Sequence, residues 1–127
     1  MKKILVIEDS KECRSSLCQF LRIEKFQVIE AENGYTGLQL INEYHPDLVL
    51  SDLNMPKLDG YGVLKELRSN LATAQIPFIF LTGNTNSAER ELAWQMGANA
   101  YLTKPVKFDA LLEAIFTHLN PSKLGSS

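Results

Sequence analysis

The chain has 127 residues, of which 45% are hydrophobic, and 13 basic against 15 acidic residues give it a formal charge of −2. This length and apolar content predict a single globular domain with a sizeable core and leave no room for a second domain. Since the chain has no basic cluster, no long apolar span and no cleavable leader, we expect a cytoplasmic protein that binds neither nucleic acid nor a membrane.

The first apolar run, residues 3–7, predicts a strand and ends at two adjacent acidic residues, Glu8 and Asp9. Neighbouring carboxylates repel each other and raise each other's pKa, and a bound cation removes that conflict. Together with Asp52, which ends another apolar run, they form an all-oxygen donor set that suits Mg²⁺ or Mn²⁺. For either residue alone, capping of the following helix is a sufficient explanation.

The next segment predicts a helix that begins after Ser10, a suitable N-cap. Its apolar side chains recur at helical spacing: Cys13, Leu17, Phe20 and Leu21. Cys13 therefore has a packing role available. Cys18 lies roughly 140° further around the helix, so the two cysteines suit neither a mutual disulfide nor a shared metal.

A second strand is predicted at residues 27–31, and a helix at about residues 35–44. The same alternation of short apolar runs with amphipathic stretches continues to residue 119 and gives five strand–helix pairs. Such a pattern is typical of a parallel sheet that is covered by helices on both faces.

The third strand, residues 48–51, is followed by Asp52, which we expect to sit exposed at the strand tip. The loop at residues 52–60 contains turn residues, and a helix is predicted at about residues 60–70. An Asp carboxylate can attack phosphorus and form an aspartyl phosphate when a metal neutralises the phosphoryl oxygens. Asn54 could add its backbone carbonyl to that metal or could be a plain turn residue, and the sequence leaves both alternatives open.

The fourth strand, residues 77–81, ends at Thr82, which precedes Gly83. A hydroxyl beside a residue without a side chain is well placed to donate to a phosphoryl oxygen. A Thr before a Gly is also ordinary turn chemistry.

The helix predicted at residues 87–96 has a thin apolar face, formed by Ala88, Leu92, Ala93 and Met96. Trp94 falls off this stripe, at ~200° from Leu92. It is either a partly covered surface residue or an anchor for a partner.

The fifth strand, residues 100–102, leads to Lys104-Pro105. Lys104 offers a point positive charge for phosphate, and an X-Pro bond can be cis, which would aim the lysine back across the sheet edge. A last helix is predicted at residues 108–119, with Leu111, Leu112, Ile115 and Phe116 facing inward. We expect a folded domain at 1–120 and a flexible tail at 121–127, either a linker stub or an expression remnant.

Five motifs occur in this order: Glu8-Asp9, Asp52, Met55-Pro56 with Asp59-Gly60, Thr82, and Lys104-Pro105. This set resembles the receiver domain of bacterial two-component response regulators, the CheY-like family, over residues 2–119. The resemblance implies an α/β fold of the flavodoxin-like class, with a doubly wound five-stranded parallel sheet in strand order 2-1-3-4-5 and five flanking helices. It also implies a phosphoacceptor signalling domain, with at most slow self-dephosphorylation, rather than a turnover enzyme.

The resemblance also assigns roles to single residues. It implies Asp52 as the phosphoacceptor and a Mg²⁺ site in which Asp9 binds directly, Glu8 through water and Asn54 through its carbonyl. Thr82 and Lys104 would contact the phosphoryl group, and Tyr101 matches an aromatic switch position. Many family members have Asp where this chain has Glu8, and the longer side chain could change the metal affinity.

The implied partners are a histidine kinase or phosphotransfer protein as donor and an output domain or target protein as receiver of the signal. The switched surface would comprise residues 87–96, 100–102 and 108–119, with Trp94 as a partner contact, and it could also form a homodimer. The sequence fits a stand-alone regulator or a receiver excised from a longer protein.

Two other activities share this sheet. A flavodoxin-like cofactor carrier needs a phosphate-cradling first loop, but residues 8–11 are wrongly charged for an anion. A phosphatase of the haloacid dehalogenase type would need a second Asp where Asn54 stands. A receiver that has lost phosphorylation is a third alternative, against which Asp52, Thr82 and Lys104 all argue.

Overall fold

A computed structural model describes residues 1–83 and 86–119 of the chain, so the predicted tail at 121–127 lies outside the described residues. One parallel sheet forms the centre, with strands in the order β2-β1-β3-β4-β5. The strands are β1 (Lys3–Ile7), β2 (Gln27–Ala31), β3 (Leu48–Asp52), β4 (Phe78–Thr82) and β5 (Ala100–Thr103). The helices are α1 (Lys11–Ile23), α2 (Gly34–Tyr44), α3 (Gly60–Ser69), α4 (Ser87–Gln95) and α5 (Phe108–Leu119).

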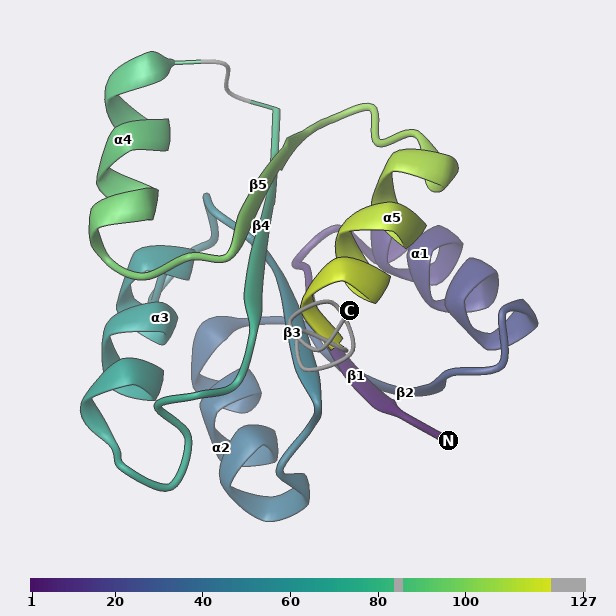
Figure 1. Cartoon of the computed structure of the whole chain (residues 1–127), viewed down its shortest axis with the longest axis horizontal. Helices are drawn as coiled ribbons and strands as arrows, with labels where there is room; N and C mark the ends of the chain where they lie inside the picture. The colour runs from purple at the N-terminus through teal and green to yellow at the C-terminus, as the bar shows by residue number, and fades with distance from the viewer. Residues whose placement is uncertain (84–85, 120–127) are drawn as a thin grey trace, which may run out of the picture.

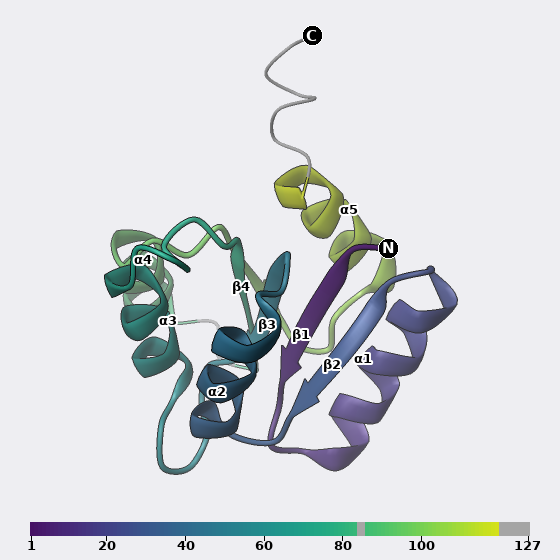
Figure 2. The ribbon, with the colours of Figure 1, turned by 90° about the horizontal axis from the view of Figure 1, so that it is seen from below.

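The helices cover both faces of the sheet. Figure 1 shows α2, α3 and α4 on one side and α1 and α5 on the other, and Figure 2 shows the same layers from below. Each side has its own apolar core, one that joins the sheet to α2, α3 and α4 and one that joins it to α1 and α5. The predicted fold class and strand order are therefore confirmed.

The central strands β1, β3 and β4 are covered on both faces, and nearly all of their side chains are buried. This burial explains their continuous apolar runs, because neither face of these strands meets water. β3 and β4 each extend one residue beyond the predicted end, so Asp52 and Thr82 are the last residues of their strands. The ladder pairs Asp52 with Leu81 and Thr82 with Thr103.

Polar side chains define where the helices begin. Ser10 is the N-cap of α1, as predicted, and its Oγ accepts from the Cys13 amide at 3.4 Å. Asp59 caps α3, where Oδ1 accepts from the Gly62 amide at 2.9 Å. Because each N-cap follows the carboxyl end of a strand within a short loop, these caps also fix the loops around that edge of the sheet.

Three side chains that were predicted to pack inward are exposed: Cys13, Leu92 and Phe116. In α1 the buried thiol is instead Cys18, which lies beside Leu17. α4 turns Ala93, its one buried residue among those described, toward the sheet. A short helix with a thin apolar stripe can rotate by one residue at little cost, so spacing alone did not fix its orientation. No helix within residues 1–83 and 86–119 is long and apolar enough to cross a membrane.

Candidate functional site

Three carboxylates from two strand ends meet at the carboxyl edge of the sheet. Glu8 and Asp9 follow β1, and Asp52 ends β3, which is paired with β1. One oxygen of each of these side chains lies within 4.8 Å of the other two. The convergence that the sequence predicted is therefore present, because the ends of neighbouring parallel strands share one edge.

Glu8 is almost completely buried, with 1% of its surface exposed, and it is held at three points. Its Oε1 forms an ion pair with Lys104, and its Oε2 accepts from the Ser10 amide at 3.1 Å. Its backbone carbonyl accepts from Nη1 of Arg14 at 2.8 Å. The first two contacts satisfy a carboxylate that would otherwise be costly to bury, and the third satisfies the backbone carbonyl.

Lys104 lies between two acidic groups. Its ammonium pairs with Glu8 and lies 3.6 Å from Oδ2 of Asp52. Burial by itself lowers the pKa of Lys104, but the hydrogen bond to Glu8 and the attraction of Asp52 outweigh it and raise the pKa. The ammonium therefore stays charged. The peptide bond between Lys104 and Pro105 is cis, and the Lys104 amide donates to the Thr82 carbonyl at 2.7 Å.

Asp9 lacks the cationic partner that Glu8 has. Burial, a hydrogen bond with the Glu8 side chain and the charge of Glu8 together raise the pKa of Asp9, and a backbone hydrogen bond and the charge of Lys104 offset this only partly. The repulsion expected between neighbouring carboxylates is thus present. A divalent cation with oxygen ligands would relieve it.

Asp52 is 8% exposed, which corrects the expectation of an exposed carboxylate. The loop that follows β3 folds back, and the Gly60 amide donates to the Leu53 carbonyl at 2.9 Å. Gly60 approaches so closely that a Cβ there would lie 2.6 Å from the Asp52 carbonyl oxygen and 2.7 Å from the Phe80 ring. The loop therefore covers the strand end, and Asp52 is buried rather than exposed at a tip.

Thr82 is fully buried, and Tyr101 on the neighbouring strand is 7% exposed. Burial and then the charge of Glu89 raise the pKa of Tyr101, against the opposing effects of Arg90 and of a hydrogen bond with Thr82. The Arg90 guanidinium lies 5.3 Å from the centre of the Tyr101 ring. A hydrogen bond therefore joins the Thr82 side chain at the site to the Tyr101 side chain below α4.

Two predicted residues lie outside this cluster of side chains. Asn54 is exposed in the loop after β3, and its carbonyl remains a predicted metal ligand. Trp94 is on α4 and 45% exposed, so its large indole is accessible to a partner. Its role as a partner contact also remains a prediction.

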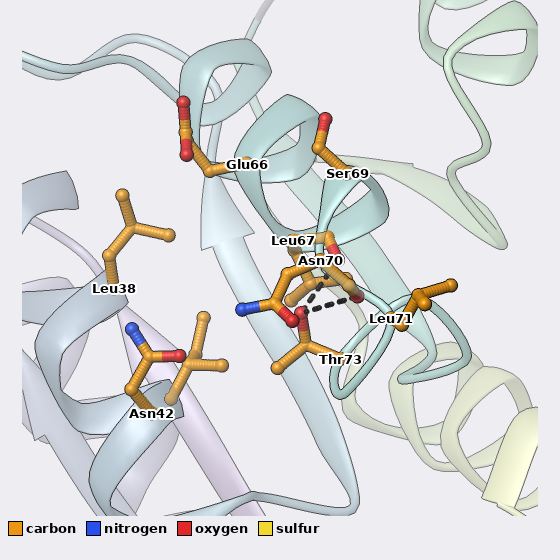
Figure 3. Close-up of a pocket in the computed structure, with 9 residues that line it drawn as sticks. Leu38, Asn42, Glu66, Leu67, Ser69, Asn70, Leu71 and Thr73 are labelled. Carbon is orange, nitrogen blue, oxygen red and sulfur yellow. Dashed lines mark hydrogen bonds between the residues drawn. The ribbon is translucent and has the colours of Figure 1, made fainter.

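Among the described residues, a cavity lies away from the site and a cleft lies beside it. A cavity of about 460 Å³ lies between α2 and the end of α3, where the Thr73 hydroxyl donates to the carbonyls of Leu67 and Asn70 (Figure 3). It is at the opposite end of the sheet from Asp52, because both helices run antiparallel to the strands. A cleft of about 360 Å³ beside Lys104 is lined by α1 and by the segment that leads into α5.

Arg14 and the Ser10 amide are the contacts of the site that sequence reasoning missed. Ser10 was identified only as a cap, although its amide also binds the Glu8 carboxylate. Arg14 reaches Glu8 across one turn of α1, and it also pairs with Glu30 on β2. An arginine on a predicted helix has no local signal that distinguishes a surface charge from such a contact.

Comparisons with known proteins agree with this geometry. The family model of the response regulator receiver domain matches residues 4–116. Protein PilH of Pseudomonas aeruginosa is 36% identical, over 91% of this chain and 95% of PilH. The crystal structure of a response regulator receiver domain protein from Clostridium thermocellum is 34% identical, covers 98% of both chains and superposes with a TM-score of 0.90.

Some relatives are much longer than this chain. A "Probable cyclic di-GMP phosphodiesterase" of Vibrio cholerae is 35% identical over 91% of this chain, which spans only 26% of that protein. The similarity therefore concerns the α/β domain described above, which occurs both nearly alone and within larger proteins.

Proposed function

Since the chain belongs to the response regulator receiver domain family, we propose that it is a phosphorylation-dependent switch in which Asp52 accepts a phosphoryl group. The donor is a histidine kinase or a phosphotransfer protein, and slow hydrolysis resets the switch. Receiver domains are signalling domains rather than turnover enzymes, so the chemistry serves to change a surface.

The observation that carries this proposal is the position of Asp52 relative to Lys104 and the acidic pair. The carboxylate is nearly buried with an ammonium 3.6 Å away, and Glu8 and Asp9 flank it. An oxygen of Asp52 attacks phosphorus, the bond from phosphorus to the donor breaks, and Lys104 offsets the negative charge of the transferred group.

The donor set fits Mg²⁺. It consists of three carboxylates from two strand ends, and Asp9 has a raised pKa that a bound cation would reverse. Asp9 and Asp52 would hold the ion directly, Glu8 through water and Asn54 through its carbonyl. When bound, Mg²⁺ supplies a positive charge that offsets the negative charge of the phosphoryl oxygens.

The phosphoryl group adds roughly −1.5 to −2 charges and three acceptor oxygens at the end of β3. Thr82 and Lys104 contact it, and Tyr101 follows Thr82 because the two side chains are already coupled. The result is a shift in the conformational equilibrium between two states of the face formed by α4, β5 and α5. An output domain or target protein, or a second copy of the chain, binds that face.

The proposal is tested by incubating the chain with acetyl phosphate and Mg²⁺ and measuring its intact mass. We expect one labile phosphoryl group, which is lost in Asp52→Asn and in the presence of a chelator. Asp109→Asn, an exposed change at the start of α5, is the matched control and should be labelled normally. If the wild-type chain gains no phosphoryl group under any condition, the chain is a phosphorylation-independent binding module.

Trp94 is the proposed contact residue on the output face, because nearly half of its surface is exposed. We expect Trp94→Ala to leave acetyl phosphate labelling of Asp52 unchanged and to weaken the binding of the output partner by the phosphorylated chain. An unchanged affinity in a binding titration would remove Trp94 from that interface.

A further inference from the structure

A line of charged side chains connects α1 and β2 to the acidic site. Arg14 is 15% exposed and donates to two groups, from Nη1 to the Glu8 carbonyl at 2.8 Å and from Nε to Oε1 of Glu30 at 3.3 Å. Arg22, about two helical turns further along α1, donates to the other oxygen of Glu30 at 3.0 Å. Both arginines therefore share Glu30, but of the two only Arg14 also donates to Glu8 among the hydrogen bonds of the described residues.

Arg14 donates to a backbone group that both acidic residues, Glu8 and Asp9, share. The Glu8 carbonyl belongs to the peptide group that joins Glu8 to Asp9. Because a peptide group is planar and rigid, the orientation of this one plane sets the directions in which both side chains leave the backbone. A hydrogen bond to the carbonyl thus acts on two carboxylates at once.

The orientation of this peptide plane matters because the carboxylates of Glu8 and Asp9 repel each other. The Glu8 side chain is fixed by Lys104 and the Ser10 amide, whereas Asp9 is exposed and could turn away to reduce the repulsion. Rotation about the Asp9 side-chain bonds leaves the peptide plane in place, whereas a turn of the backbone that re-aims both Cα–Cβ bonds would rotate this plane, and the Arg14 contact opposes that rotation. The arginine is itself braced, since its fork is engaged on two sides.

We propose that Arg14 is a positioning residue of the cation site, which holds the peptide plane between Glu8 and Asp9 so that their carboxylates stay aimed at one ion. The inference rests on the proposed function, because it concerns the same cation. Arg14 does not touch the ion and acts on it only through these two residues.

The charge of Arg14 acts in the opposite direction from its hydrogen bond. A guanidinium near a cation site repels the ion, but Glu30 lies 3.3 Å from Nε and offsets part of that charge. We therefore expect positioning to outweigh repulsion, so that removal of Arg14 weakens cation binding. If repulsion were the larger effect, removal would strengthen it.

The test is a calorimetric titration of the full chain with MgCl₂, with no phosphodonor present. We expect Arg14→Met and Arg14→Lys each to weaken Mg²⁺ binding roughly tenfold, the size typical for contacts that orient a metal ligand. The lysine keeps the charge but cannot engage both acceptors. The matched control is Arg22→Met, which removes the other partner of Glu30 and should leave the affinity unchanged. Thermal melts in chelator confirm that each variant is folded. If Arg14→Met does not fold, the Mg²⁺ affinity of Arg14→Lys alone tests the proposal.

Three results would overturn the inference. Affinity equal to or above wild type in both Arg14 variants would show that the contact does not position the ligands. Full affinity in Arg14→Lys alone would show that engagement of both acceptors is not needed, and equal losses in Arg14→Met and Arg22→Met would assign the effect to Glu30. A wild-type chain that binds no Mg²⁺ would instead contradict the proposed function itself.

Discussion

Glu8 shows how far single-residue reasoning reaches in this site. The sequence predicted correctly that Glu8, Asp9 and Asp52 converge, because all three follow apolar strands with a common direction. It did not predict that Glu8 pairs with Lys104, since a partner 96 positions away depends on strand order and side-chain length together. Nor could it predict the buried Asp52, whose cover comes from a loop that folds back.

The two cysteines differ in environment, and their chemistry should differ with it. Cys13 is exposed, whereas Cys18 is fully buried, and burial followed by the charge of Glu30 raises the pKa of Cys18 to about 11. We expect an aromatic disulfide reagent at neutral pH to modify one thiol quickly and the second only on unfolding. Two equally fast thiols would contradict the burial of Cys18.

The raised pKa of Cys18 also makes stability depend on pH. In the folded chain the thiol has a pKa of about 11, whereas in the unfolded chain it has its ordinary pKa of 9.0. The contribution of the Cys18 thiol to the unfolding free energy is therefore fully present below pH 9 and is lost as the pH rises toward 11. Chemical denaturation over this range should show a steeper decline in unfolding free energy for wild type than for Cys18→Ala. Parallel curves would exclude Cys18 as the source.

At the scale of elements, strands were easier to predict than helix orientation. β1, β3 and β4 match their apolar runs to within one residue because every position in such a run must avoid water. α4 has only Ala93 buried among its described residues, so its pattern did not specify which side faces the sheet. The prediction that Leu92 packs inward was wrong, and 43% of that residue is exposed.

α4 contains a buried polar atom whose effect can be measured. Oε2 of Glu89 is shielded from solvent and has no hydrogen-bond partner among residues 1–83 and 86–119. Leaving such a group unpaired costs about 1–3 kcal/mol, whereas a carboxylate in a first helical turn gains only about 0.3–1 kcal/mol. Glu89→Met should therefore raise the unfolding free energy by about 1 kcal/mol in urea melts. The control, Glu91→Met, is exposed on the same helix. A loss of stability in Glu89→Met would show that the carboxylate is satisfied.

At the scale of the whole molecule, a single sheet separates two apolar cores, and the acidic site lies at its edge. Since the carboxylates come from two strands that are paired through the centre of the sheet, an ion bound there stabilises the entire fold. At a Mg²⁺ concentration tenfold above its dissociation constant, the gain in unfolding free energy should be about 1.4 kcal/mol. Thermal melts with and without chelator measure it, and Asp9→Asn should reduce the difference. Identical melts for wild type would argue against an ion at this edge.

Two glycines near the carboxyl ends of β3 and β4, Gly60 and Gly83, obey opposite constraints. A Cβ at Gly60 would collide with the backbone of β3 and with the Phe80 ring, whereas a Cβ at Gly83 meets no described atom within 4 Å. In a saturation library selected for folded protein, position 60 should therefore tolerate no replacement, while position 83 should accept alanine. The loop over the end of β3 is thus closed to sequence variation at position 60, and position 83, directly after β4, is where related chains are free to diverge.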